Sequence, residues 1–218
     1  PCLGVIPSGS GSDFAWASKV GPRVDRALQQ IVAGDLRPVD IGQITHPTHG
    51  SRYFANSAGM FIVAAISIRA REMKRLHGLA MYVAATIKSI AHDFDAVPIR
   101  LIVDGVESSP EVIMLSVGNG AREGGGFMTN PSARNDDGLF NFMLSSRISR
   151  LRMLRLLPSI MMGRQERHSC VLMGTGSTIS ISASEAVAVH LDGEVWATTS
   201  EHLRELRFDI HPGAIRVL

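Results

Sequence analysis

The sequence is poor in cysteine and in charge, and each shortage excludes a class of protein. Cys2 and Cys170 are its only two cysteines in 218 residues, so a disulfide scaffold and a cysteine-built zinc site are both excluded. Charged residues make up 19% against 45% hydrophobic residues, which excludes intrinsic disorder because a core can form. The net charge of +2 does not favour a nucleic acid as partner.

Long hydrophobic runs are also missing. The two most apolar stretches, residues 60–68 and 79–91, contain a charge or end short of the roughly 18 to 20 residues that a membrane-spanning helix needs. We therefore expect a cytoplasmic protein. Residues 1–7 are typical of a buried strand and lack the pattern of a signal peptide, so we expect a further segment upstream of them.

A glycine- and serine-rich turn, residues 8–13, separates this strand from a helical run that starts at Phe14. A strand, a glycine-rich turn and a helix start bring several backbone N–H groups to one small space, where a phosphate can bind. The alternative is a tight connection in which Ser12 or Asp13 caps the helix. Both interpretations stay open on these residues alone.

The segments up to residue 93 predict helices and one hairpin. Residues 22–32 have the spacing of a helix, and residues 39–44 and 52–56 predict the two strands of a hairpin. Residues 59–93 have the composition of a helical region that is divided at Gly78.

Short β-rich segments separated by turn residues follow to the end of the chain, which is typical of an antiparallel sandwich. Between them, residues 149–162 predict a helix in which Pro158 introduces a kink or a break. The predicted strands are 97–103, 112–117, 139–144, 169–173, 178–182, 187–191, 195–198, 206–210 and 214–218.

Two acidic turns are candidates for chemistry. Asp192-Gly193-Glu194 holds two carboxylates at the rim of a sheet, where neighbouring negative charge raises a carboxylate pKa toward values that suit a general base. Residues 135–139 offer the oxygen ligands that Mg²⁺ or Ca²⁺ prefers, without the spacing of a calcium loop. In isolation, an ordinary turn is the stronger interpretation of each.

Arginines surround the predicted helix 149–162. A basic, partly apolar surface helix can rest on an anionic membrane, which predicts a peripheral position at the inner membrane face. The alternative is a helix packed on the core with solvated arginines. The arginines are Arg147, Arg150, Arg152, Arg155, Arg164 and Arg167.

Four motifs in a fixed order resemble the bacterial diacylglycerol kinase catalytic family, which includes sphingosine and ceramide kinases. The resemblance implies an α+β fold: a C-terminal antiparallel β-sandwich with helical insertions over 37–218, and part of an α/β nucleotide-binding domain over 1–36. The active site is expected in the cleft between them. The motifs are residues 3–15, residues 115–120 with Gly124-Gly125-Gly126-Phe127, Asp137-Gly138-Leu139 and Leu191-Asp192-Gly193-Glu194.

The resemblance also implies an activity, the ATP- and Mg²⁺-dependent phosphorylation of a lipid hydroxyl on diacylglycerol, a sphingoid base or a similar lipid. Glu194 is implied as the proton acceptor, and Asp192 as its partner through Mg²⁺ or by orientation. A cation is implied at Asp137 with the backbone carbonyls of Leu139 and Arg134. The implied nucleotide contacts are Gly9, Ser10, Gly11 and Asp13.

Two departures from the family pattern affect nucleotide binding. Ser12 replaces the usual asparagine and so lacks an amide donor. The family's Gly-Gly-Asp-Gly-Thr loop does not occur in this sequence, so we expect the C-terminal part of a lipid kinase that is inactive in isolation. The alternative is a non-catalytic β-sandwich module for binding or regulation, in which the motifs survive only as turns.

Overall fold

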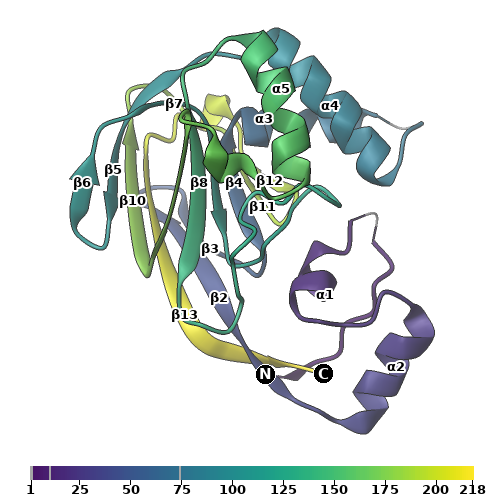
Figure 1. Ribbon diagram of the computed structural model, residues 1–218. Helices are drawn as coiled ribbons and strands as arrows, with labels where there is room; N and C mark the ends of the chain where they lie inside the picture. Colours follow the sequence, from purple (N-terminus) through teal and green to yellow (C-terminus); the bar gives the residue numbers. More distant parts are fainter. Residues whose placement is uncertain (1, 10, 74) are drawn as a thin grey trace.

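Antiparallel strands form most of the structure, a computed structural model that describes residues 2–9, 11–73 and 75–218 (Figure 1). The helices of these ranges are α1 (Asp13–Ala17), α2 (Val24–Ala33), α3 (Ile62–Glu72), α4 (Gly78–His92) and α5 (Arg150–Met161). The strands are β1 (Cys2–Leu3), β2 (Arg37–His46), β3 (Gly50–Phe54), β4 (Ser57–Phe61), β5 (Val97–Val103), β6 (Val106–Ser108), β7 (Glu111–Gly118), β8 (Phe140–Ser146), β9 (Val171–Gly176), β10 (Thr178–Ala183), β11 (Val189–Leu191), β12 (Glu194–Ala197) and β13 (Glu205–Val217).

The strands belong to one curled sheet whose neighbours run in the order β12-β11-β4-β7-β5-β10-β13-β2-β3. β5 joins the two halves, because it pairs with β10 on one side and with β7 on the other. β8 pairs with β7, and β9 continues from β8. Among the pairs of the described residues, β1 with β13 alone is parallel. The predicted α+β fold with an antiparallel β-sandwich is therefore confirmed.

The two halves of the sheet enclose a common core. The Phe54 ring stacks on Phe140 with centroids 5.7 Å apart, and it meets Phe208 edge-on at 6.2 Å. These rings come from β3, β8 and β13, so the aromatic contact joins distant parts of the sheet. Along β5, Val97, Ile99 and Leu101 are buried while the residues between them are exposed, which is the two-residue period of a half-buried strand.

Helices α3, α4 and α5 cover the outer face of the sheet at β4, β7 and β8 (Figure 1). β7 is buried on both faces, which explains why apolar residues occupy the consecutive positions 112–115. None of the helices in the described ranges is long and apolar enough to span a membrane. The helical layer has its own core, made of Ile62, Val63, Ile90, Ile113, Met114, Phe127, Met143, Met153, Leu156 and Ile160.

Three sequence expectations about elements are wrong. Residues 59–61 end strand β4, because pairing with β7 and β11 on both sides outweighs their helical composition. The opening segment forms a two-residue exposed strand, with Leu3 45% exposed, because it lies on the margin of β13. Pro158 does not break α5, which continues to Met161 and closes with a hydrogen bond from the Met162 N–H to the Pro158 carbonyl.

Candidate functional site

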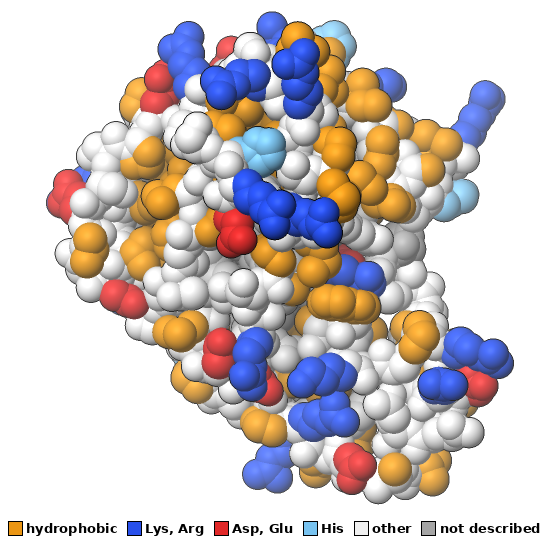
Figure 2. Space-filling view, viewed as in Figure 1, with side chains coloured by type: hydrophobic (Ala, Val, Ile, Leu, Met, Phe, Trp, Pro, Cys, Tyr) orange, Lys and Arg blue, Asp and Glu red, His pale blue; other side chains and the backbone are white. Residues whose placement is uncertain are grey.

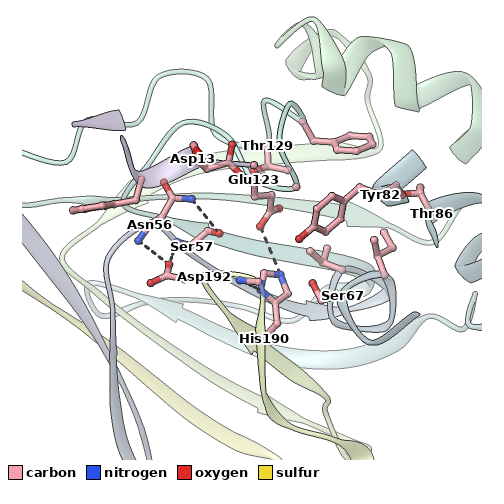
Figure 3. Close-up of a pocket in the computed structure, with 18 of the residues that line it drawn as sticks. Asp13, Asn56, Ser57, Ser67, Tyr82, Thr86, Glu123, Thr129, His190 and Asp192 are labelled. Atoms are coloured by element: carbon pink, nitrogen blue, oxygen red, sulfur yellow. Dashed lines mark hydrogen bonds and ion pairs between the residues drawn. The ribbon is translucent and has the colours of Figure 1, made fainter. Parts of the chain in front are cut away.

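A pocket of about 420 Å³ lies between the N-terminal segment and the helical layer (Figure 3). One end is apolar, because α3, α4 and α5 contribute side chains such as Ile66, Ile90 and Leu157. The other end is polar, and its side chains come from the loop before α1, the segment between β3 and β4, the glycine-rich loop after β7, and the β11–β12 turn. The polar side chains labelled in Figure 3 are Asp13, Asn56, Ser57, Ser67, Tyr82, Thr86, Glu123, Thr129, His190 and Asp192.

The predicted nucleotide loop contributes Gly9, Gly11 and Asp13 to this pocket, while Ser10 lies outside the described residues. A Cβ atom at Gly9 would meet only the Ser12 Oγ atom, at 3.9 Å, so the backbone there is open to a ligand. The Ser12 hydroxyl donates to the Gly9 carbonyl at 3.1 Å and makes no hydrogen bond that caps α1. The helix-capping interpretation of Ser12 is therefore wrong.

Asp13 joins this loop to the glycine-rich loop after β7. Its carboxylate lies 2.8 Å from the Arg122 Nε atom and accepts the Gly125 N–H at 2.9 Å. Burial raises the pKa of Asp13, and the Gly125 N–H and Arg122 oppose that rise. Arg122 also donates to the Gly11 carbonyl at 3.2 Å and lies over the Trp16 ring, 4.9 Å from its centroid. Arg122 thus positions the loop, a role that no sequence pattern indicates.

The Gly118-Asn119-Gly120 motif is a structural crossover. Asn119 is buried, and its amide group donates to the carbonyls of Asp40 and Ala55 at 2.8 Å each. A Cβ atom at Gly120 would lie 2.1 Å from the Asn56 Oδ1 atom, so the close approach of these two segments requires glycine. The motif therefore sets the distance between the glycine-rich loop and the β3–β4 connection.

Asp192 and Gly193 form a tight hairpin turn in which both residues have positive φ angles, 52° and 85°. The Asp192 carboxylate accepts the N–H groups of Ala55, Asn56 and Ser57 at 2.8, 2.8 and 2.9 Å. Burial raises the pKa of Asp192, and these three N–H groups oppose the rise. The carboxylate therefore ties the hairpin to the β3–β4 connection at the edge of the pocket.

Glu194, the second carboxylate of this hairpin, lines the same pocket as Gly9, Gly11 and Asp13. Its side chain is exposed and forms an ion pair with Arg71 of α3. The fold thus brings the Asp-Gly-Glu motif and the N-terminal glycine loop together from opposite ends of the chain, as the sequence analysis expects.

Glu123 and His190, which no motif singles out, form a buried contact between ionisable side chains in the pocket (Figure 3). The His190 Nε2 atom lies 3.7 Å from a Glu123 carboxylate oxygen, and its Nδ1 atom accepts the Gly193 N–H at 3.3 Å. Burial raises the pKa of Glu123 to about 7 and lowers the pKa of His190 to about 4. Near neutral pH, His190 is therefore uncharged and carries its proton on Nε2, facing Glu123.

The sequence carries a faint signal for both residues. His190 stands between Val189 and Leu191 in a strand that is buried throughout, where an ionisable side chain is unusual. A Cβ atom at Gly59 in the neighbouring strand would lie 2.2 Å from the His190 Nε2 atom, so this glycine makes room for the imidazole. Glu123 is the one acidic residue of the glycine-rich loop, residues 118–127.

The predicted cation residues Asp137, Leu139 and Arg134 do not line the pocket. The Asp137 carboxylate accepts the Leu139 N–H at 3.1 Å, and Arg134 pairs with Asp136 at 3.0 Å. In the described part of the chain, no three His, Cys, Asp or Glu side chains converge as a metal site requires. The predicted site combines the Asp137 carboxylate with the backbone carbonyls of Leu139 and Arg134, and it stays a prediction.

Comparison with known proteins matches two family models. Residues 57–218 match the YegS C-terminal NAD kinase beta sandwich-like domain, and residues 1–44 match the diacylglycerol kinase catalytic domain. The chain is 27% identical over 194 residues to a "Diacylglycerol kinase" of Mycobacterium tuberculosis, covering 88% of this chain and 62% of that protein. It is also 27% identical to a "Probable lipid kinase YegS-like" protein of Pseudomonas aeruginosa, over 99% of this chain and 67% of that protein.

Solved structures support the fold. A crystal structure of a diacylglycerol kinase from Bacillus anthracis superposes with a TM-score of 0.66 and 16% identity, covering all of this chain and 66% of that one. A second crystal structure from the same organism gives a TM-score of 0.77 with 22% identity, covering all of this chain and 69% of that one. At these identities the similarity establishes the architecture. The chain thus spans less than two thirds of the first of its curated relatives, and the resemblance seen in its motifs is confirmed.

Proposed function

Since the chain belongs to the YegS C-terminal NAD kinase beta sandwich-like family, whose named relatives are lipid kinases, we propose that it forms the lipid-binding part and one wall of the nucleotide site of an ATP-dependent lipid kinase. One observation carries the proposal. A single pocket is lined by the Gly9–Gly11 loop, by the Asp192–Glu194 turn and by an apolar cavity. Phosphoryl transfer to a lipid needs a phosphate-binding backbone, a proton acceptor and a place for the hydrocarbon chain, held together.

The apolar end of the pocket is the part suited to the lipid chain. Its side chains come from three helices that form one packed layer, so the cavity is built into the fold. Each buried methylene group contributes about 0.8 kcal/mol, so the hydrocarbon supplies most of the binding free energy. The lipid headgroup would then lie among the polar side chains at the other end.

Glu194 is the residue that we propose as the proton acceptor for the lipid hydroxyl. It is at the rim of the pocket, where its only described ionic partner is Arg71. In this proposal Asp192 is a positioning residue, because three backbone N–H groups already occupy its carboxylate. ATP supplies the phosphoryl group when bound, and the open backbone at Gly9 would face its phosphates.

A membrane-facing surface is part of the same proposal. Ser149 caps α5, and no acidic residue occurs between residues 147 and 165. The outer side of this helix combines exposed arginines with exposed apolar side chains (Figure 2), as interfacial helices do. An anionic bilayer complements both features, and the pocket lies beneath this helix. The exposed apolar residues are Leu151, Leu154, Met161 and Met162.

Lipid binding by the 218-residue chain tests the proposal. We expect dioctanoylglycerol to displace a fluorescent fatty alcohol from the protein, and Ile66→Trp, which fills the apolar end, to weaken binding at least tenfold. Val32→Trp is the matched control, because Val32 is 87% exposed on α2. If the wild type binds no dioctanoylglycerol, or Ile66→Trp binds it unchanged, the pocket does not hold the lipid.

Measurements of turnover test the contribution of the missing nucleotide loop and that of Glu194 separately. We expect negligible lipid-dependent ADP release from this chain, because the sequence lacks the Gly-Gly-Asp-Gly-Thr loop and phosphoryl transfer depends on positioning. In a fusion that adds such a loop upstream, Glu194→Gln should lower turnover by roughly 10² to 10⁴. Glu107→Gln, on an exposed carboxylate outside the pocket, is the control. Unchanged turnover in Glu194→Gln would assign the proton to another acceptor.

Co-sedimentation with vesicles tests the membrane surface. Double substitution Leu154→Glu with Arg155→Glu should weaken binding to vesicles containing phosphatidylglycerol by roughly tenfold or more, since each basic residue near an anionic surface contributes about 1 kcal/mol. Leu28→Glu, on the exposed side of α2, is the control. Equal sedimentation with pure phosphatidylcholine, or an unaffected double variant, would exclude α5 as the contact.

A further inference from the structure

We infer that Glu123 and His190 form a polar anchor inside the pocket for a second hydrogen-bond donor on the lipid headgroup, a hydroxyl or ammonium group beside the hydroxyl that is phosphorylated. The assignment rests on the proposed lipid-kinase function and adds to it the class of lipid that the pocket selects. It starts from Glu123, a buried carboxyl of the pocket for which the described residues complete no hydrogen bond.

Glu123 is 7% exposed, and neither of its carboxyl oxygens has a hydrogen-bond partner in the described ranges. The hydroxyls of Ser57, Ser116 and Thr129 lie close enough to the carboxyl to lower its pKa against the effect of burial, although none of them has the distance and angle of a formed hydrogen bond. Leaving a buried acceptor unpaired costs about 1–3 kcal/mol, and more when it is charged. Because this carboxyl lines the pocket, a bound ligand can supply the missing donor.

The protein's own cations do not serve Glu123. Arg122, its neighbour in sequence, turns to Asp13, and Arg71 pairs with Glu194 at the rim. His190 lies 3.7 Å away, too far for a hydrogen bond, and burial keeps it uncharged. Its Nδ1 atom accepts the Gly193 N–H, which leaves the Nε2 atom on the side of the Glu123 carboxyl.

The carboxyl groups at the polar end of the pocket suit a donor group and not an acceptor. The polar end of the pocket carries the carboxylates of Asp13, Glu123, Asp192 and Glu194 against two guanidinium groups, so a donor that is also positively charged fits best. A site built around a buried polar group binds ligands that cannot pair with it more weakly, because the group is left unsatisfied. The pocket should therefore distinguish lipids by a second donor as well as by chain length.

Three ligands with the same ten-carbon chain test the anchor: 1-decanol, 1,2-decanediol and 2-amino-1-decanol. We expect calorimetric titration of the wild-type chain to give the diol an affinity about fivefold higher than decanol, the gain of one neutral hydrogen bond. The amino alcohol should gain tenfold or more, because its hydrogen bond to the carboxylate is charge-assisted.

Two substitutions of Glu123 test whether its carboxyl causes the differences in affinity. Glu123→Leu keeps the volume and should bring all three ligands to the affinity of decanol. Glu123→Gln keeps an acceptor without the charge, so the diol should keep its advantage and the amino alcohol should lose its additional one. Asp35→Leu, on an exposed residue outside the pocket, is the control.

The possible failures are distinct. If decanol itself does not bind, the lipid pocket of the proposed function is wrong. If all three ligands bind the wild type equally, the pocket stands and the anchor is wrong. An advantage that persists in both Glu123 variants places the donor site elsewhere and likewise overturns the anchor.

Discussion

Asp40 and Glu123 are both buried carboxyls, 2% and 7% exposed, but they lie in two regions that differ in the hydrogen bonds they offer. Asp40, in β2, lies where the 134–139 turn meets the irregular part of β13, and its two oxygens accept the N–H groups of Gly138 and Gly213 at 2.7 Å each. Glu123, in the pocket, accepts no hydrogen bond in the described ranges. One carboxyl holds two loops to the sheet, and the other is left available.

Asp192 shows that the pocket does not lack donors in general. Its carboxylate is at the pocket edge and accepts three backbone N–H groups, as a structural carboxylate does. Glu123 differs from Asp192 in that both of its oxygens lack a hydrogen-bond partner among the described residues. Unsatisfied buried groups persist in folded proteins chiefly where function uses them, which is the physical basis for separating the two regions.

The largest expected change in the free energy of unfolding is that of an Asp40 substitution. Asp40→Ala should lower the free energy of unfolding by about 3–5 kcal/mol, because two N–H groups lose their charged partner inside the protein. Urea unfolding followed by circular dichroism measures the change. Asp137→Ala, in the neighbouring exposed turn, should change it by less than about 1 kcal/mol. A loss below 1 kcal/mol in Asp40→Ala would mean that the loops are held by other contacts.

Glu123→Leu should change the free energy of unfolding in the opposite direction. Replacing an unpaired buried carboxyl by an apolar side chain of similar volume should raise the free energy of unfolding at pH 8 by about 1–3 kcal/mol. The same unfolding experiment measures it, with Asp35→Leu as the control. A destabilised Glu123→Leu protein would show that the carboxyl has an internal role in the fold, and the contrast with Asp40 would disappear.

The pH dependence of stability sharpens this contrast. The pKa of Glu123 rises from its ordinary 4.5 to about 7 on folding, so the unfolded state ionises first and stability falls as pH rises from about 4.5 through 7, by on the order of 3 kcal/mol. The pKa of His190 falls from 6.5 to about 4, so its contribution is lost as pH falls from 6.5 to 4. The two contributions oppose each other over the shared range.

The Glu123→Gln variant separates the contributions of Glu123 and His190 to the pH dependence of stability. In this variant stability should rise with pH between about 4 and 6.5, as His190 alone dictates, and the fall toward pH 7 should disappear. Asp13 raises the pKa of Glu123, and Asp13 and Glu123 both raise the pKa of Tyr82, so the variant also loses these repulsions. Identical pH profiles for the two proteins would contradict the buried, titrating Glu123.

The smallest effect is expected at Glu194. Its ion pair with Arg71 is exposed, and exposed pairs contribute about 0–1 kcal/mol. Glu194→Gln should therefore leave the free energy of unfolding almost unchanged, as measured beside Asp40→Ala. A loss of 2 kcal/mol or more would make Glu194 a structural residue and weaken its assignment as the proton acceptor.

Much of the fold is predictable because short sequence patterns indicate many of its elements. The alternation along β5, the apolar spacing of α5 and the Asp192-Gly193 turn each need only a few neighbouring residues to be recognised. Strand β4 is the informative failure. Its Ser, Ala, Gly and Met residues have no strand propensity of their own, and its conformation follows from pairing with β7 and β11 on either side.

The sequence by itself determined the family, the antiparallel class and the motifs that line the pocket, because these depend on residue type and spacing along the chain. Tertiary structure alone decided which carboxyl is satisfied and which is free. Asp192 accepts three N–H groups from the β3–β4 connection, Asp13 pairs with Arg122, and Glu123 lies beside an uncharged His190 and three hydroxyls without a charged partner among the described residues. These outcomes depend on contacts between segments far apart in sequence, and on the burial that removes the water which would otherwise make all the carboxyls alike.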